Sequence, residues 1–294
     1  MRTTLTLLPV LLALAGCSTE PPAARPAPDA ALDAYCEVAG QAGLDSWVGD
    51  VVTLCGPAED DHAVACRSMR VAGSELQPIA LPDGVDAVRV LPAGDALVVS
   101  ALDGRLLLVR DGAIARELAP QAADVWVDEA GTRAVYVAPA DEGAELELGT
   151  PSVIAAVELA TGAREVLVDD SEASTPRPIP GSRDVLFVST REGLASLYVV
   201  RAGGAIERLT HEGLTEWSPD AVPVPDRELA FVSGVLVYAA ELDDGPRLWA
   251  IDLATREVRE LGSGSWPRPH GPGEVVALQA SGACAAVLPV GGAR

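Results

Sequence analysis

Residues 196–210 read SLYVVRAGGAIERLT, an apolar run followed by a Gly-Gly turn and a second short run. Residues 216–220, EWSPD, come next, and residues 229–233, LAFVS, form another apolar run. Runs of this kind, separated by Gly, Asp and Pro, continue from about residue 85 to the end. No stretch after residue 45 sustains helical spacing. Short strands at regular spacing predict an all-β fold, which is a sandwich, a barrel or a propeller.

Internal repetition favours the propeller among these folds. Residues 175–181, TPRPIPG, and residues 266–273, WPRPHGPG, each precede an apolar run. Aligned on such matches, repeat units begin near residues 86, 123, 174, 215 and 265. Their spacing brackets the roughly 40–50 residues of a four-stranded blade.

An earlier set of strands is expected within residues 46–82, at 47–54, 63–71 and 76–81. These strands bring the number of expected blades to six. We expect N-terminal strands to complete the C-terminal blade, because an open ring would expose unpaired backbone groups at both of its ends.

Residues 174–262 resemble the TolB-type propeller repeat. That repeat reads as a strand, a Gly-Gly turn, Arg-Leu-Thr, then Trp-Ser-Pro-Asp and an apolar strand ending in Ser. Here Pro225-Asp226 holds the place just before that last strand, so Trp217-Ser218-Pro219-Asp220 is displaced upstream. The resemblance implies a six-bladed β-propeller of four-stranded blades. TolB itself also carries an N-terminal α/β domain, for which this chain has no room, so the resemblance is to the propeller family.

The N-terminus carries an export signal. Arg2 precedes an apolar run over residues 5–13, and Leu14-Ala15-Gly16-Cys17 resembles the bacterial lipobox. The resemblance implies cleavage before Cys17 and attachment of diacylglycerol to its sulfur, which would hold the protein stably on a membrane. Ser18, in place of Asp, implies the outer membrane, with the protein facing the periplasm or the cell surface. An ordinary signal peptide with a chance Cys at its end is the alternative.

Three segments are therefore expected along the chain. Residues 1–16 form the lipoprotein signal peptide, residues 17–29 a disordered tether rich in Pro and Ala, and residues 30–294 the propeller domain. Residues 30–42 predict a short helix, which Asp29 can cap and which would pack on the propeller rim.

Four cysteines besides Cys17 indicate two disulfides, since an even number is typical of exported proteins. A turn between Cys55 and Cys66 would place these two opposite each other in a hairpin, leaving Cys36 to pair with Cys284. The pairing of Cys36 with Cys55 and of Cys66 with Cys284 is the alternative. In either case one bond joins the two ends of the domain.

Composition excludes a nucleic-acid partner and offers no catalytic motif. The chain has 294 residues, with 21 basic and 43 acidic side chains and a formal net charge of −22. Phosphate backbones require clustered cations. No metalloprotease, nucleophile-elbow, phosphate-loop or dinucleotide motif is present. We therefore expect no catalytic residue, no metal site and no cofactor.

Arginine and tryptophan recur on the strands expected to line the central channel. Both residue types often anchor protein interfaces, and clustered arginines in an acidic molecule focus positive potential. The alternative is that the tryptophans wedge between blades and the arginines pair with neighbouring aspartates. The candidate partner-binding residues on this channel face are Arg89, Trp126, Arg177, Trp217, Trp266, Arg268 and His270.

These features predict a lipid-anchored, monomeric envelope propeller that binds an envelope protein or acidic peptide without converting it. The alternative is a propeller enzyme of the hydrolase or dehydrogenase type, acting on a small molecule in the channel. A passive surface lipoprotein is the third possibility.

Overall fold

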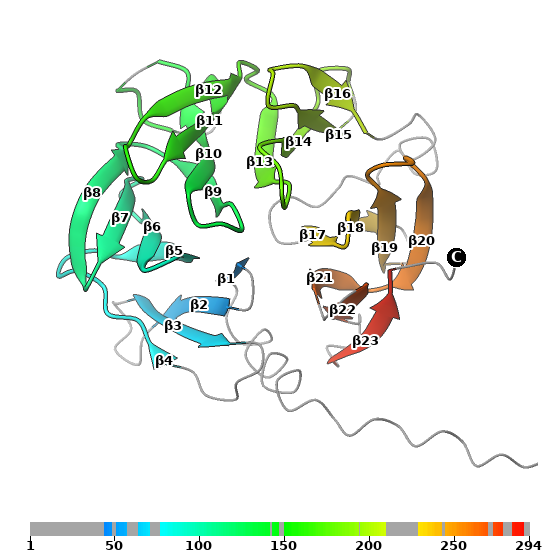
Figure 1. The fold of residues 1–294 in the computed structure, drawn as a ribbon, viewed down its shortest axis with the longest axis horizontal. Coiled ribbons are helices and arrows are strands. Elements are labelled where there is room, and N and C mark those ends of the chain that lie inside the picture. Colours follow the sequence, from blue (N-terminus) through cyan, green and yellow to red (C-terminus); the bar gives the residue numbers. More distant parts are fainter. Residues whose placement is uncertain are drawn as a thin grey trace, which may run out of the picture.

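Six antiparallel sheets form a ring in the computed structural model of the protein (Figure 1). The structure describes residues 44–48, 51–57, 64–70, 77–141, 143–146, 150–193, 195–209, 229–242, 245–269, 273–278 and 284–290. The expected signal peptide, tether and rim helix lie outside these residues, as do Cys17, Cys36, Trp217 and His270.

The sheets follow the chain in order, and we number them blades 1 to 6. Blade 1 consists of β1 (Leu44–Val48), β2 (Val51–Pro57), β3 (Val64–Arg70) and β4 (Gln77–Pro78). Blade 2 consists of β5 (Ala87–Ala93), β6 (Ala96–Ala101), β7 (Leu106–Arg110) and β8 (Ala113–Ala119). Blade 3 consists of β9 (Ala123–Val127), β10 (Arg133–Pro139), β11 (Ser152–Glu158) and β12 (Arg164–Val168). Blade 4 consists of β13 (Ala173–Pro178), β14 (Val185–Ser189), β15 (Ser196–Val200) and β16 (Ile206–Arg208). Blade 5 consists of β17 (Leu229–Val232), β18 (Val235–Leu242), β19 (Gly245–Asp252) and β20 (Val258–Ser263). Blade 6 consists of β21 (Ser265–Pro269), β22 (Glu274–Leu278) and β23 (Cys284–Pro289).

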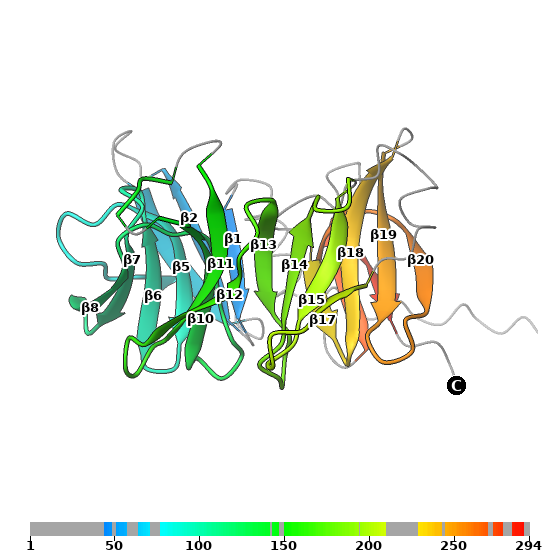
Figure 2. The same ribbon diagram turned by 90° about the horizontal axis from the view of Figure 1, so that it is seen from above.

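The first strand of each blade lies nearest the centre of the ring, and the last strand lies at the rim (Figure 1). Seen from the side, the strands run across the thickness of the disc (Figure 2). This arrangement confirms the predicted six-bladed β-propeller.

The core lies between blades, because successive side chains of a strand point to opposite faces of its sheet. In β14, Val185 and Phe187 pack toward blade 3, whereas Leu186 and Val188 pack toward blade 5. All five residues of this strand are buried. A strand covered on both faces needs a continuous apolar run, which explains why such runs recur along the sequence.

Closure of the ring differs from the expectation. The N-terminal strands form the complete blade 1, and the residues expected as one strand at 47–54 contribute to both β1 and β2. In the described part of the chain, blade 6 consists of β21, β22 and β23 alone. The N-terminal strands that the structure describes therefore pair in a sheet of their own and do not complete the C-terminal blade.

The start of the fifth blade was also misplaced. The sequence places the start of this unit near residue 215, ahead of the apolar run at 229–233. In the structure this run is β17, the first strand of blade 5. Ser233 and Gly234, both with positive φ, turn the chain directly into β18.

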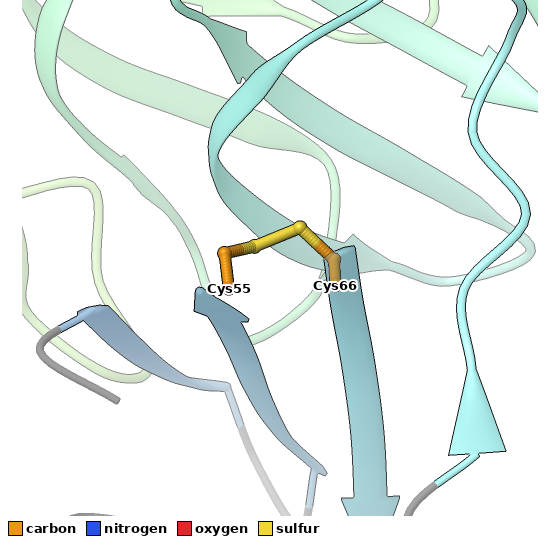
Figure 3. The surroundings of a disulfide bond; sticks show 2 residues. All are labelled: Cys55 and Cys66. Atoms are coloured by element: carbon orange, nitrogen blue, oxygen red, sulfur yellow. A yellow bond between two sulfur atoms is a disulfide. The ribbon is translucent and has the colours of Figure 1, made fainter. Parts of the chain in front are cut away.

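A disulfide joins Cys55 and Cys66, which lie directly opposite each other on β2 and β3 (Figure 3). Both residues are buried, and they pack against Val90, Val99 and Leu107 of blade 2. The bond therefore lies in the core between blades 1 and 2. It agrees with the first of the two connectivities considered above. The Cys36–Cys284 bond stays a prediction, since the structure places only the backbone of Cys284, in β23.

Candidate binding channel

An irregularity recurs in the first strands of four blades. The register with the second strand shifts immediately before Arg89 in β5, Arg177 in β13 and Arg268 in β21. A shift in the same part of β9 lies between Ala123 and Trp126. Such bulges bend a strand and re-aim the side chain that follows. Four of the residues predicted for the channel face therefore occupy equivalent positions.

Trp126 is the centre of a cation–π cluster that joins three blades. The guanidinium carbon of Arg177 lies 3.7 Å from the centre of the indole ring, and that of Arg89 lies 4.9 Å from it. Arg89 also donates a hydrogen bond from Nη1 to the Val125 carbonyl at 3.4 Å. The indole packs in addition against the apolar cores on both sides of blade 3. Trp126 thus serves as a wedge between blades and as part of the channel face.

Arg177 and Arg268 are held in the same way by two copies of a Pro-Arg-Pro sequence. In each copy the arginine Nη1 donates to the carbonyl of the preceding proline, at 3.0 Å from Arg177 to Pro176 and 2.9 Å from Arg268 to Pro267. Both arginines are buried, with exposed fractions of 3% and 4%. Proline has no backbone N–H to offer at this edge of the strand. In both Pro-Arg-Pro sequences the arginine guanidinium is therefore the main hydrogen-bond donor.

A cavity of about 220 Å³ opens between the first strands of blades 3 to 6. It is smaller than the roughly 300–1,000 Å³ of a site for a drug-sized ligand, so it suits a side chain or a chain terminus. Among the described residues, its charged lining consists of Arg177, Arg268 and Glu129. The other lining residues are Trp126, Val127, Pro178, Pro180, Leu229, Ala230, Phe231 and Pro269.

The cavity favours an anionic group. Of the three charged side chains that the described residues contribute, two are arginines, in a molecule whose formal net charge is −22. The planar fork of a guanidinium matches a carboxylate through two parallel hydrogen bonds. The indole Nε1 of Trp126 is buried and has no hydrogen-bond acceptor within the described residues. Buried donors are normally satisfied, so this N–H is an exception among the buried polar groups of the described residues.

The structure brings together four of the seven candidate residues, Arg89, Trp126, Arg177 and Arg268, of which Arg89 supports Trp126 without lining the cavity. Trp266 belongs to β21, but its side chain is not among those described. The sequence prediction did not include Glu129, Leu229 or Phe231. The signal available for Glu129 was its place just after a channel-lining strand.

The described residues contain no cluster of three or more His, Cys, Asp or Glu side chains able to hold a metal ion. The same part of the chain includes no helix long and apolar enough to cross a bilayer.

No protein-family model matches the sequence. No curated protein sequence matches it either. Among solved structures, the chain is similar to a protein of Agrobacterium tumefaciens assigned as TolB, with 16% identity and a TM-score of 0.54, over 76% of this chain and 83% of that one.

Two further structures show the same likeness. For TolB of Acinetobacter baumannii the identity is 13% and the TM-score 0.55, over 82% of this chain and 64% of that one. For an oligogalacturonate lyase of Vibrio parahaemolyticus the values are 11% and 0.56, over 78% of this chain and 67% of that one. At these identities the similarity shows the propeller fold, which by itself does not choose between binding and catalysis.

Proposed function

We propose that this TolB-like propeller is a non-enzymatic binding module, which takes a carboxylate-bearing segment of another envelope protein into its channel. The observation that carries the proposal is the pair Arg177 and Arg268. They occupy equivalent positions in blades 4 and 6, bond their own prolines in the same way, and line one cavity with Trp126.

The geometry supports recognition by pre-organised groups. Stacking on Trp126 and the bond to Pro176 restrain the Arg177 side chain before any ligand arrives, so little conformational entropy remains to be lost on binding. Arginine and tryptophan in a desolvated position are also the usual anchors of a protein interface. The positive channel in an acidic molecule would attract an acidic segment and repel a basic one.

The proposed location is the outer membrane, with lipid attached to Cys17 and the propeller facing the periplasm. The motif Leu14-Ala15-Gly16-Cys17 carries this part of the proposal. The Cys55–Cys66 disulfide supports export, since such bonds persist mainly in oxidising compartments. A tether rich in proline would hold the propeller away from the membrane surface.

Site-specific photo-crosslinking in intact cells tests the function. Benzoylphenylalanine replaces Phe231, which lines the cavity, or Ile114, which is exposed on β8 at the rim. We expect a discrete envelope protein to be linked from position 231 and not from position 114. The adduct should disappear in the Arg177→Gln/Arg268→Gln background and persist with Arg110→Gln. An adduct that forms equally at both positions, or survives loss of both channel arginines, would overturn the proposal, as would no adduct at all.

A further inference from the structure

A second hollow of about 550 Å³ adjoins the channel cavity at the mouth of the ring. It is formed by the turn between β9 and β10 and the turn between β13 and β14. Glu129 and Pro180 line both hollows, so the two spaces are neighbours. The remaining lining residues of this mouth hollow are Asp128, Ala130, Ile179, Gly181, Ser182 and Arg183.

The described residues place three charged side chains in the mouth hollow, and two of them are engaged within the protein. Asp128 accepts hydrogen bonds from the backbone N–H groups of Thr132 at 2.6 Å and Arg133 at 3.0 Å, and from the Thr132 hydroxyl at 2.7 Å. Arg183 pairs with Glu158 at 2.7 Å, and this contact raises the pKa of the guanidinium. These two residues hold the turns in shape.

Glu129 differs from both. Its side chain is exposed, and it makes no hydrogen bond or ion pair with any described residue. It lies at the junction, facing the channel cavity on one side and the mouth hollow on the other. A ligand that reaches from the mouth hollow into the channel cavity therefore meets the negative charge of Glu129 as well as the positive charges of Arg177 and Arg268.

We propose that the channel ligand is an ampholytic peptide segment, with a carboxylate bound by Arg177 and Arg268 and a basic side chain bound by Glu129. This inference rests on the proposed function and names the chemistry of its ligand. A purely acidic segment would suffer repulsion at Glu129, whereas a segment with both charges meets an opposite charge at each point. Charge order of this kind gives an interface its specificity.

The shapes of the two hollows point to an extended chain. The inner cavity admits one side chain or terminus, and the outer hollow is larger and more open. A ligand that occupies both must be elongated and must pass beside Glu129 and Pro180. A peptide with its acidic residue inward and its basic residue a few positions away meets both requirements.

Fluorescence anisotropy with short labelled peptides, using the full-length protein, tests the inference. The probes are Gly/Ser peptides carrying one Glu, one Glu and one Lys separated by one to four residues, one Lys, or no charge. We expect the best-spaced Glu/Lys peptide to bind the wild type about fivefold more tightly than the Glu peptide, as a partly exposed ion pair allows. In the Glu129→Arg variant the Glu peptide should bind more tightly than the Glu/Lys peptide, because the site then offers a third positive side chain beside Arg177 and Arg268.

Glu117→Arg is the matched control, because Glu117 is exposed on β8 and the substitution changes the net charge equally. It should leave the preference of the wild type intact. If the Glu and Glu/Lys peptides bind equally at every spacing but both require Arg177 and Arg268, the ampholytic inference fails and the proposed function stands. If no peptide binds in a manner that depends on these arginines, both fail. The inference is also overturned if Glu129→Arg leaves the order of affinities unchanged.

Discussion

The guanidinium carbon of Arg177 lies 3.7 Å from the centre of the Trp126 ring, so blades 3 and 4 meet at the channel through one stacked pair. The same indole packs into the apolar cores on both faces of blade 3. The candidate binding surface and the contact between blades are therefore built from shared side chains. A change in the channel is expected to alter stability as well as binding.

Arg177→Lys should separate charge from geometry. Lysine keeps the positive charge but lacks the planar group that stacks on the indole and the fork that bonds the Pro176 carbonyl. We expect the free energy of unfolding to fall by about 1 kcal/mol, measured by urea denaturation. The control is Arg110→Lys, since the Arg110 side chain is half-exposed and should change stability by less than about 0.5 kcal/mol. Equal losses in the two variants would contradict a specific role for stacking.

The strands were predictable where both faces of a sheet are covered. The apolar run that follows residues 175–181 is β14, Val185–Ser189, and all of its residues are buried. The run at 229–233 has the same composition, yet it forms the first strand of its blade instead of the second. Burial on two faces explains the composition of both strands, and it says nothing of how far a strand lies from the axis. The local sequence pattern therefore predicts where the strands lie, but not which strand begins the fifth blade.

The channel site was predictable only in part, for a related reason. Arg177 and Arg268 could be found because they sit in two copies of Pro-Arg-Pro, and Trp126 because its position recurs from blade to blade. Glu129 lies in a turn and resembles the many other exposed acidic residues of this chain. It gains its place in the site only because the turns of blades 3 and 4 lie next to each other. That neighbourhood depends on the whole ring.

Gly131→Ala should destabilise the contact between the turns of blades 2 and 3. Gly131 has a φ of +67°, and a Cβ there would lie 2.8 Å from the backbone nitrogen of Gly94. Gly181 has a similar φ of +72° with open space around it. We expect Gly181→Ala to cost about 1 kcal/mol for its left-handed backbone. Gly131→Ala should cost about 1–3 kcal/mol more, because backbone atoms must shift.

The comparison of these two glycines uses chemical denaturation under identical conditions. Because the φ values are nearly equal, the difference between the variants isolates the steric term. Equal costs would mean that the turns of blades 2 and 3 separate easily, in which case the close approach at Gly94 contributes little to the ring.

The Cys55–Cys66 bond should stabilise the first blade against unfolding. It closes a short loop, with a sequence separation of 11, and the chain-entropy estimate for a loop of this size is about 3 kcal/mol. For a domain of this length that corresponds to a melting temperature roughly 6–12 °C lower in Cys55→Ala/Cys66→Ala. Calorimetry of the oxidised protein and the double variant measures the difference. A melting temperature unchanged by the double substitution would show that the bond does not stabilise the first blade.

Reduction of the double variant then tests the second predicted bond. If Cys36 and Cys284 are joined, dithiothreitol should lower the melting temperature of Cys55→Ala/Cys66→Ala further. An unchanged melting temperature, together with two free thiols in the non-reduced protein, would exclude that pairing.

Ion pairs between blades 4 and 5 should make stability depend on pH. Arg201 donates to Glu207 at 2.6 Å, and this bond, aided by Arg256 of the next blade, holds the pKa of Glu207 below its ordinary value. A carboxyl whose pKa is lower in the folded state stabilises the fold above its unfolded pKa, near 4.3. That contribution is lost as the pH falls through the folded pKa. Acid should therefore weaken the junction between these blades.

Glu207→Gln provides the measurement. At pH 7 the variant should be less stable by up to about 1 kcal/mol, because Glu207 is partly exposed and water screens the pair. At pH 3 the difference should shrink toward zero, because protonated glutamate resembles glutamine, and added salt at pH 7 should shrink it as well. Glu117→Gln, at an exposed position of blade 2, controls for the loss of one negative charge. A difference that stays constant between pH 7 and pH 3 would show that Glu207 acts through packing and not through its charge.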